Sequence, residues 1–286
     1  MLSQSLFGRK PLAYSGGLRV LLNNSEENKR ISERYKLRAR QATPVDVEGM
    51  LAVEKAAWEP TRTVVFEPDH FTAQMVIYPQ GQLVLEVEDR EEGTSKIVGV
   101  LNSRKGDKSE ISRDMTWEGC ADGGFIRNHN PKGKILFPIN ESFLPTAESL
   151  GGIGLLEGAM IALAVSEGCE AIVFGSRIPR LAAFNCKMLR RRKPRLTGLE
   201  YATMRKPNGR FYDPLIAKFM SVPFMEFVEV LHGYYDDPES ENYAALMACH
   251  NPLYLYHLGW LYKGLFAKTI GRPVIRFLEK AVREGA

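Results

Sequence analysis

The chain contains 286 residues, of which 44% are hydrophobic and 25% are charged, and its formal net charge is +4. This length allows one large domain or two small ones, and the composition is ordinary for a soluble globular protein. The mild positive charge does not indicate a nucleic-acid-binding protein, although it suits a phosphorylated cofactor or an acidic protein partner.

No stretch of about 18 uninterrupted apolar residues occurs, so the sequence predicts no membrane-spanning helix. The four cysteines are scattered without a CxxC pair, and the five histidines show no metal-ligand spacing. We therefore expect neither a disulfide framework nor a metal site, and a reducing, cytoplasmic location fits this cysteine usage.

The first predicted segments are a leader, a strand and a helix. Residues 1–34 are polar and are expected to form a flexible leader, and "YKLRARQA" (35–42) alternates as a strand does. A helix is expected over 43–58, because Thr43 is a good N-cap, Pro44 suits the first helical position and apolar residues recur at helical spacing.

The next predicted segments are a second helix, two strands that pair as a hairpin, a polar region of loop with some irregular structure, and another strand. The second helix covers 68–78, and the two strands of the hairpin cover 81–89 and 97–104. The polar region covers 105–132, and the next strand covers 134–144.

The rest of the chain begins with a glycine-rich turn at 148–154. After this turn we predict a helix at 153–167 and a strand at 170–176. A second helix at 213–220, a second strand at 224–231 and a helical C-terminal extension at 251–286 follow.

The order of these elements predicts the fold class. The middle of the chain is expected to run β-α-α-β-β-β-α-β, and this mixed order favours an α/β or α+β domain over residues 35–250. We expect a mixed, mostly antiparallel central sheet with helices on both faces.

The glycine-rich turn is predicted to bind phosphate. Gly151, Gly152 and Gly154 stand where a helix begins, although glycine is a poor helix former. The first N–H groups of a helix have no internal partner and attract anions, and bare backbone allows a pyrophosphate to approach them. Leu155 follows the last glycine, so the Walker A pattern fails, and Glu157 occupies the third glycine position of GxGxxG.

The turn instead resembles the acyl-CoA turn of the GNAT acetyltransferase superfamily, Gln/Arg-x-x-Gly-x-Gly/Ala. "SLGGIG" (149–154) matches its two glycines and lacks the leading Gln/Arg. The predicted order of elements also matches: one strand, two helices, three strands, the glycine turn, a helix and a strand. A glycine-rich bend without a ligand is the alternative interpretation.

Over roughly 35–248 the chain is more closely similar to the GNAT-like loading domains of some polyketide synthases. A helix end and a strand start in that family share a set of residues with this chain, namely Glu54, Trp58, Glu59 and Pro60, then Pro79, Gln80, Gly81, Gln82, Val84, Leu85 and Glu86. Three later segments also agree in order and spacing: "HNPKGKILFPINESFLP", "LEYATMRKPNGRFYDPLIAKFM" and "GYYDDPESENYAALM".

This resemblance implies a GNAT fold, an acyl-CoA donor and an acyl carrier protein, or polyketide synthase, whose phosphopantetheine thiol receives the acyl group. Some members first decarboxylate malonyl-CoA. The histidine of their pattern is Met220 here, and the threonine of their fifth strand aligns near Phe174. Because neither side chain can donate a proton, we expect no decarboxylation by that route.

The resemblance also implies site residues. Trp58 is expected to wall the acyl pocket, and Ser176, Arg177 and Tyr201 are candidates for proton handling. The alternatives are a core aromatic for Trp58 and ordinary polar residues for Ser176 and Tyr201. Backbone donors for the pantetheine arm and the pyrophosphate are expected from Phe143, Leu144, Leu150, Gly151, Gly152, Ile153, Gly154 and Leu155.

Two charged or aromatic segments remain. "RRRKPR" (190–195) is either a solvated loop or a docking site for an acidic carrier protein or the 3′-phosphate of CoA. The aromatic extension 251–286 is predicted to pack on the core or to contact a partner, with a membrane surface as an alternative.

The sequence therefore predicts an acyltransferase that moves an acyl group from CoA to a carrier-protein thiol. An N-acyltransferase for a small amine or amino acid, and a non-catalytic acyl-CoA-binding module, are the two alternatives.

Overall fold

The computed structural model describes residues 13–16, 33–58 and 66–254. One sheet runs through this region in the order β1-β2-β3-β4-β5-β6-β8-β7. Its strands are β1 (Ala13–Gly16), β2 (Tyr35–Gln41), β3 (Gln82–Asp89), β4 (Thr94–Gly106), β5 (Ile135–Phe143), β6 (Ala171–Arg177), β7 (Met225–His232) and β8 (Tyr243–His250).

All neighbouring strands pair antiparallel except β5 and β6, which are parallel. The sheet is therefore mixed and mostly antiparallel, as the sequence predicts.

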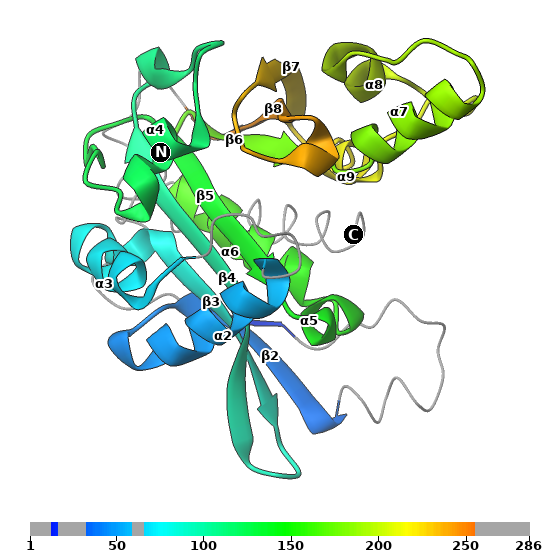
Figure 1. The fold of residues 1–286 in the computed structure, drawn as a ribbon. Coiled ribbons are helices and arrows are strands. Elements are labelled where there is room, and N and C mark those ends of the chain that lie inside the picture. The colour runs from blue at the N-terminus through cyan, green and yellow to red at the C-terminus, as the bar shows by residue number, and fades with distance from the viewer. Residues whose placement is uncertain (1–12, 17–32, 59–65, 255–286) are drawn as a thin grey trace.

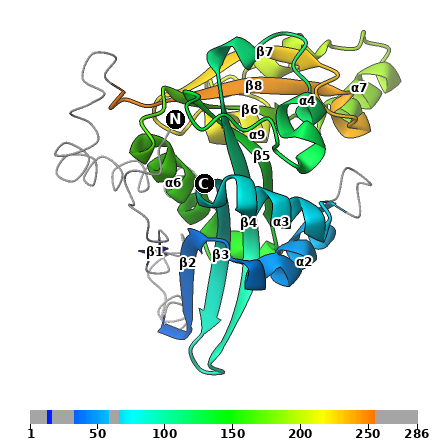
Figure 2. The same ribbon diagram turned by 90° about the vertical axis from the view of Figure 1, so that its left-hand side faces the viewer.

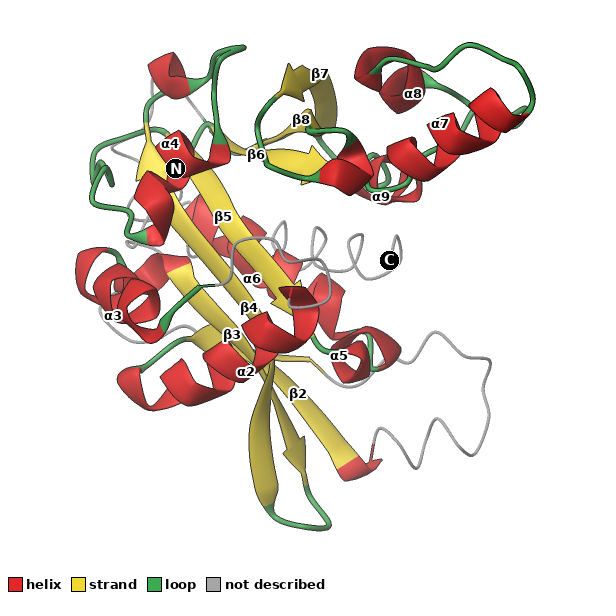
Figure 3. Ribbon diagram, viewed as in Figure 1, coloured by secondary structure: helices red, strands yellow, loops and turns green. Residues whose placement is uncertain are grey.

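Helices cover both faces of this sheet. In Figure 1, α2 and α3 lie in front of β3 and β4, whereas α6 lies behind them, and Figure 2 shows the same two layers from the side. The α-helices are α2 (Val47–Trp58), α3 (Pro68–Ile77), α4 (Trp117–Ala121), α5 (Pro145–Ser149), α6 (Gly152–Ser166), α7 (Leu181–Arg190), α8 (Gly198–Thr203) and α9 (Pro214–Phe219). The last three lie beside β6, β7 and β8 (Figure 3).

The start of the first helical segment is set by local chemistry. Pro44 opens a short 3₁₀ turn that continues into α2, and Asp46 Oδ2 accepts hydrogen bonds from the backbone N–H of Thr43 at 2.8 Å and from its hydroxyl at 2.7 Å. These bonds satisfy donors that the helix leaves free, as expected for the predicted N-terminus.

The core helix α6 carries only two polar side chains, Glu157 and Ser166. Every residue of α6 except Ile153 is buried, because the helix packs on β2, β3 and β4 and is covered by neighbouring segments. A helix with so few polar side chains must be surrounded by protein. The face of the sheet on which α6 lies is therefore a buried face.

The fold differs from the predictions at several places, and the leader is one of them. Residues 13–16 pair with β2 as a strand, so the prediction of a flexible leader is wrong for these four residues. Residues 1–12 and 17–32 of the leader and residues 255–286 of the predicted extension lie outside the described residues.

The central strand β8 was also not predicted. Its sequence, "YAALMACH", is rich in alanine and other residues that favour helices. It forms a strand because it lies between β6 and β7 and pairs with both, so tertiary pairing overrides local propensity.

Candidate active site

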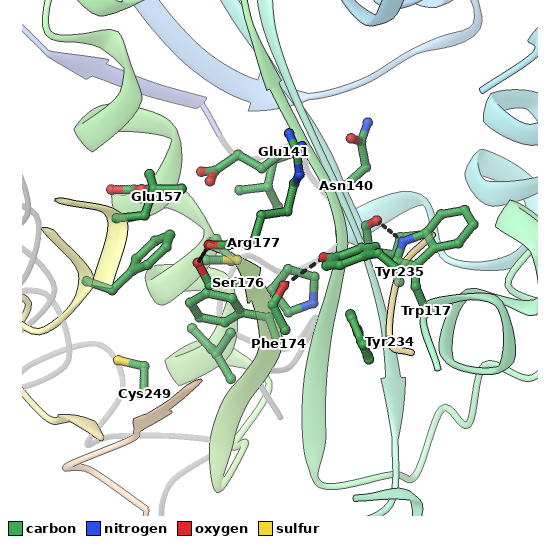
Figure 4. A pocket seen from close by; sticks show the side chains of 18 of the residues that line it. Trp117, Asn140, Glu141, Glu157, Phe174, Ser176, Arg177, Tyr234, Tyr235 and Cys249 are labelled. Carbon is green, nitrogen blue, oxygen red and sulfur yellow. Dashed lines mark hydrogen bonds between the residues drawn. The ribbon is translucent and has the colours of Figure 1, made fainter. Parts of the chain in front are cut away.

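A cavity of about 750 Å³ lies where β5 and β6 separate. The two strands pair only at Ile135–Ala171 and Leu136–Ile172, after which they diverge. Pro138 follows in β5, and the register between β4 and β5 shifts next to it, between Asn102 and Ser103. The cavity occupies this gap and is lined by residues on both faces of the sheet, from α2 on one face and from α6 and α9 on the other (Figure 4).

A buried carboxyl lies on the α2 side of the cavity. Glu54 Oε2 accepts hydrogen bonds from Ser142 Oγ at 2.7 Å and Asn140 Nδ2 at 2.9 Å, and Trp58 Nε1 donates to Ser142 Oγ at 2.7 Å. Burial raises the pKa of Glu54 to about 7, although the hydrogen bonds from Ser142 and Asn140 favour the ionised form. A carboxyl that titrates near neutral pH is suited to accept a proton.

Two further carboxyls approach each other on the α6 side. Glu141 of β5 and Glu157 of α6 lie together in Figure 4, and Lys218 Nζ is 2.9 Å from Glu157 Oε1. Burial, together with the charge of Glu157, raises the pKa of Glu141 to about 8. Glu141 Oε1 and Glu157 Oε2 are buried, and neither has a hydrogen-bond partner within the described part of the chain. This side of the cavity therefore holds buried acceptor oxygens and one carboxylate bound to a lysine, while the raised pKa of Glu141 favours its neutral form at pH 7.

Three of the four predicted catalytic residues, Trp58, Ser176 and Arg177, do line the cavity. The Arg177 guanidinium lies over the Trp58 ring, 5.3 Å from its centroid, and contacts Asp237 at 2.7 and 2.8 Å and Glu239 at 2.9 Å. Ser176 Oγ donates to the carbonyl of Arg177 at 3.1 Å. The Arg177 guanidinium is therefore bound to carboxylates of the protein itself.

The fourth, Tyr201, does not line this cavity. Its ring is fully buried in a second hydrophobic cluster with Ile178, Leu181 and Ile216, and its hydroxyl donates to Asp213 Oδ2 at 3.2 Å. The aromatic residue in "LEY" is thus a core residue whose hydroxyl is bound, so the structure does not place it among the groups that could handle protons.

The eight predicted cofactor-binding residues also lie outside the lining of this cavity. The N–H of Leu144 donates to Val98 O at 2.9 Å, and the N–H of Leu150 donates to Thr146 O at 3.2 Å. These two amides are therefore not available for pantetheine or pyrophosphate, and the prediction is wrong for them.

Other amides of β5 do face the gap. Because hydrogen bonding alternates along an antiparallel strand, the pairing of Leu144 with Val98 turns the amides of Phe143 and Glu141 away from β4. They point to the side on which β6 diverges. Phe143 and Glu141 both belong to "ESFLP" (141–145), the segment expected to supply donors for the pantetheine arm.

The glycines at the start of α6 have a packing role. Gly151 has φ +68°, which glycine adopts readily. A Cβ added to Gly152 would lie 2.4 Å from Leu85 Cδ2 and 3.1 Å from Ala147 O. Close packing therefore explains Gly152 without a ligand, while the first N–H groups of α6 still lack partners within the helix.

We expect Gly152→Ala to destabilise the ligand-free protein by about 1–3 kcal/mol, since its methyl group must displace a buried leucine and a backbone carbonyl. Urea unfolding of both proteins without CoA measures this difference. Gly119→Ala is the control for inserting a methyl group, because Gly119 lies in helix α4 and only the Thr116 hydroxyl, at 3.1 Å, would be near the added methyl group. Equal stability of Gly152→Ala and the native chain would show that packing does not require this glycine.

Several residues of the site were not among the predicted catalytic residues. Asn140 and Ser142 point to α2 and Glu141 points to α6, as alternation along a strand requires. The signal in the sequence is a run of polar residues, "NES", inside the otherwise apolar strand "ILFPINESF". Polar residues at buried strand positions need partners, and these partners lie at the cavity.

Two solved structures share this architecture. The loading GNATL domain of CurA from Lyngbya majuscula has a TM-score of 0.60 and 21% identity, covering 76% of this chain and 97% of that domain. The GphF GNAT-like decarboxylase in complex with isobutyryl-CoA has a TM-score of 0.56 and 18% identity, covering 74% of this chain and 98% of the decarboxylase chain. This chain has the GNAT fold. The fold predicted from the order of elements is therefore confirmed.

Comparison with curated proteins of Bacillus subtilis (strain 168) gives two similar sequences. The uncharacterized N-acetyltransferase YkwB is 25% identical over 220 residues, which span 76% of this chain and 90% of YkwB. The probable hydrolase YhcX is 27% identical over 188 residues, but they span only 34% of YhcX and 65% of this chain. No protein-family model matches the chain.

The described residues contain neither a candidate membrane-spanning helix nor a candidate metal-binding group. Within the part of the chain that the structure describes, no helix is both long and apolar enough to cross a membrane. In the same residues, no group of three or more histidine, cysteine, aspartate or glutamate side chains is arranged to hold a metal ion.

Proposed function

We propose that this chain is an acyl-CoA-dependent acyltransferase whose reaction takes place in the gap between β5 and β6. The observation that carries this proposal is the cavity at the gap, with the Glu54 carboxyl buried beside it. The GNAT fold supports it, as do the similar proteins, which include an uncharacterized N-acetyltransferase and a GNAT-like decarboxylase in complex with isobutyryl-CoA.

The donor would extend from the start of α6 into the gap. The N–H groups of Gly152, Ile153 and Gly154, in the first turn of α6, suit its pyrophosphate, because helix N-termini attract anions. The amides of Phe143 and Glu141 face the gap and suit the pantetheine arm and the thioester. Fixed N–H donors that meet a developing oxyanion lower the barrier to acyl transfer.

Glu54 is proposed as the proton acceptor. The acceptor thiol or amine attacks the thioester carbonyl, a new bond to carbon forms, and the bond from carbon to the CoA sulfur breaks. Glu54 takes the proton of the acceptor, and the departing thiolate of CoA is protonated to complete the exchange. The hydrogen bonds from Ser142 and Asn140 hold the carboxylate of Glu54 in place for this step.

The acceptor that we propose first is the phosphopantetheine thiol of an acyl carrier protein, because a loading domain with this fold is among the similar structures. A small amine is the second candidate, since the relative matched over 220 residues is described as an N-acetyltransferase.

Decarboxylation of a malonyl donor is not part of this proposal. Phe174, at the position of the family's threonine, lines the cavity, whereas Met220, at the position of its histidine, does not. The cavity also contains Glu141 and Glu157. A free carboxylate beside this pair would lose its hydration, and Lys218 is already bound to Glu157.

The proposal is tested by incubating the protein with acetyl-CoA, malonyl-CoA and octanoyl-CoA, together with a holo carrier protein or a mixture of amines. Intact-mass spectrometry distinguishes the outcomes. Acylated carrier protein supports the first acceptor and acylated amine the second. CoA binding without any transfer supports a non-catalytic acyl-CoA-binding module, and absence of binding contradicts the proposal.

A further inference from the structure

We propose that the donor carries an uncharged aliphatic acyl group longer than acetyl, which binds on the α6 side of the cavity. This inference rests on the proposed function and names the class of its donor. The part of the cavity concerned is here called the apolar chamber, and it is lined by Met160, Ile161, Ile172, Phe174, Leu215, Phe219, Val222, Met225 and Cys249.

The floor of the apolar chamber is formed by three adjacent strands. Ile172 of β6 pairs with Cys249 of β8, which pairs in turn with Met225 of β7. Paired residues on neighbouring strands share a face of the sheet, so these three side chains lie side by side. Phe174 is two residues beyond Ile172 and therefore points to the same face.

Two helices form the walls. Met160 and Ile161 come from α6, and Phe219 comes from α9. The rings of Phe219 and Phe174 meet edge to face, with centroids 4.9 Å apart. The chamber is thus enclosed by the sheet and by two helices, and its walls are hydrocarbon, aromatic or thiol groups.

The position of the chamber links it to the reacting thioester. Phe174 precedes Gly175 and Ser176 on the strand that diverges from β5, and all three line the cavity. A thioester in the gap would therefore place its acyl group against Phe174, with Ile172 and Cys249 beyond it. An acetyl group, which has only two carbons, would fill a small part of a cavity of about 750 Å³.

The acidic pair restricts the chemistry of that acyl group. Glu141 Oε1 and Glu157 Oε2 are buried without partners among the described residues, and Lys218 binds the other oxygen of Glu157. A dicarboxylic acyl group would bring a carboxylate beside these two acidic side chains, and among the described residues Lys218, which lies against the pair, is already bound to Glu157. Neutral aliphatic chains meet no such penalty.

The test measures dissociation constants of acetyl-, butyryl-, hexanoyl-, octanoyl- and succinyl-CoA by calorimetry, without an acceptor. Each buried methylene is expected to tighten binding roughly fourfold, until the chamber is full. Succinyl-CoA is expected to bind at least tenfold more weakly than butyryl-CoA, which has the same chain length without the charge.

Variants locate the acyl chain. Cys249→Phe should fill the chamber and remove the preference for octanoyl-CoA, while affinity for acetyl-CoA changes little. Val222 lies in a loop that lines the chamber, so Val222→Phe should also reduce the space for the acyl chain. This variant replaces Cys249→Phe if that protein does not fold. Cys186→Phe is the matched control, because Cys186 is exposed on α7.

The outcomes separate this inference from the proposed function. If acetyl- and octanoyl-CoA bind equally well, or if Cys249→Phe and Val222→Phe leave the chain-length preference unchanged, the chamber does not hold the acyl group and the proposed function still stands. Equal affinity for succinyl- and butyryl-CoA contradicts the role of the acidic pair. If none of the five thioesters binds, the proposed function itself fails.

Discussion

Glu54→Gln is expected to lower the rate of acyl transfer at pH 8 by at least about a hundredfold, the usual contribution of a positioned general base. Glutamine keeps the shape of the side chain and can still accept the hydrogen bonds that Ser142 and Asn140 donate to Glu54. It cannot accept a proton from the attacking thiol or amine. Steady-state kcat/KM with a fixed acceptor measures the loss.

The dependence of the rate on pH gives a second readout of the same substitution. Because the pKa of Glu54 is raised to about 7, the carboxyl is protonated below that pH and cannot act as a base. Native kcat/KM should therefore rise with pH and reach a plateau above about pH 7. Glu54→Gln should lack this rise between pH 6 and 8.

Stability should respond in the opposite sense to activity. The folded-state pKa of Glu54 lies above its ordinary value, so burial favours the neutral carboxyl. The stability that this preference contributes is fully present below pH 4.5 and is lost as the pH rises through 7. At pH 8 Glu54→Gln should be as stable as the native chain or more stable, which separates loss of a base from loss of the fold.

The control for this substitution is Glu48→Gln, which removes a carboxylate from an exposed position in the first turn of the same helix. Its rate and pH profile should match those of the native protein. If Glu54→Gln retained the native rate and the native pH profile, Glu54 would not be the base, and the proposed mechanism would have to use another group.

Elements with strong periodicity could be predicted from the sequence. Strand β5 and helix α6 were located within two residues of their observed bounds, because their residues favour a single structure locally. Strand β8 could not be found in this way, since its alanine-rich sequence becomes a strand only between two others.

The site was predictable only in part. Trp58, Ser176 and Arg177 line the cavity, and each lies at or next to the end of a predicted element, while their roles remain predictions. The partners of Glu54 are 86 and 88 residues away along the chain, and its raised pKa arises only when β5 packs on α2. Local patterns carry no information on such contacts.

Tyr201 shows the reverse case. A segment that resembles the family placed it among the candidates, but its ring packs in the second hydrophobic cluster and its hydroxyl binds Asp213. A match of residue type therefore does not fix the direction in which the side chain points.

The Arg177 contacts lead to the largest stability effect that we expect. Arg177→Met should destabilise the protein by about 3 kcal/mol, because it leaves the Asp237 carboxylate, which is 1% exposed, without its cation. Urea unfolding at pH 7 measures this loss. Arg190→Met, at an exposed end of α7, is the matched control and should change stability little.

The pH dependence of this difference follows from Asp237. Burial disfavours its ionised form, but hydrogen bonds from Arg177 and Ser240 hold its pKa below the ordinary value. The stabilisation from the ion pair is therefore present above pH 4 and is lost as the pH falls below it. The difference in free energy of unfolding between the native chain and Arg177→Met should therefore become smaller as the pH falls below 4.

A double variant distinguishes a missing cation from a missing side chain. Asp237→Asn removes the negative charge that Arg177→Met leaves unpaired, so the pair of substitutions should recover much of the stability that the single change loses. Activity should not recover with it, because the Arg177 guanidinium also lies over the Trp58 ring, and Trp58 donates to Ser142 beside Glu54. If the double variant regained full activity, Arg177 would serve only to neutralise Asp237, and the position of Trp58 would not depend on it.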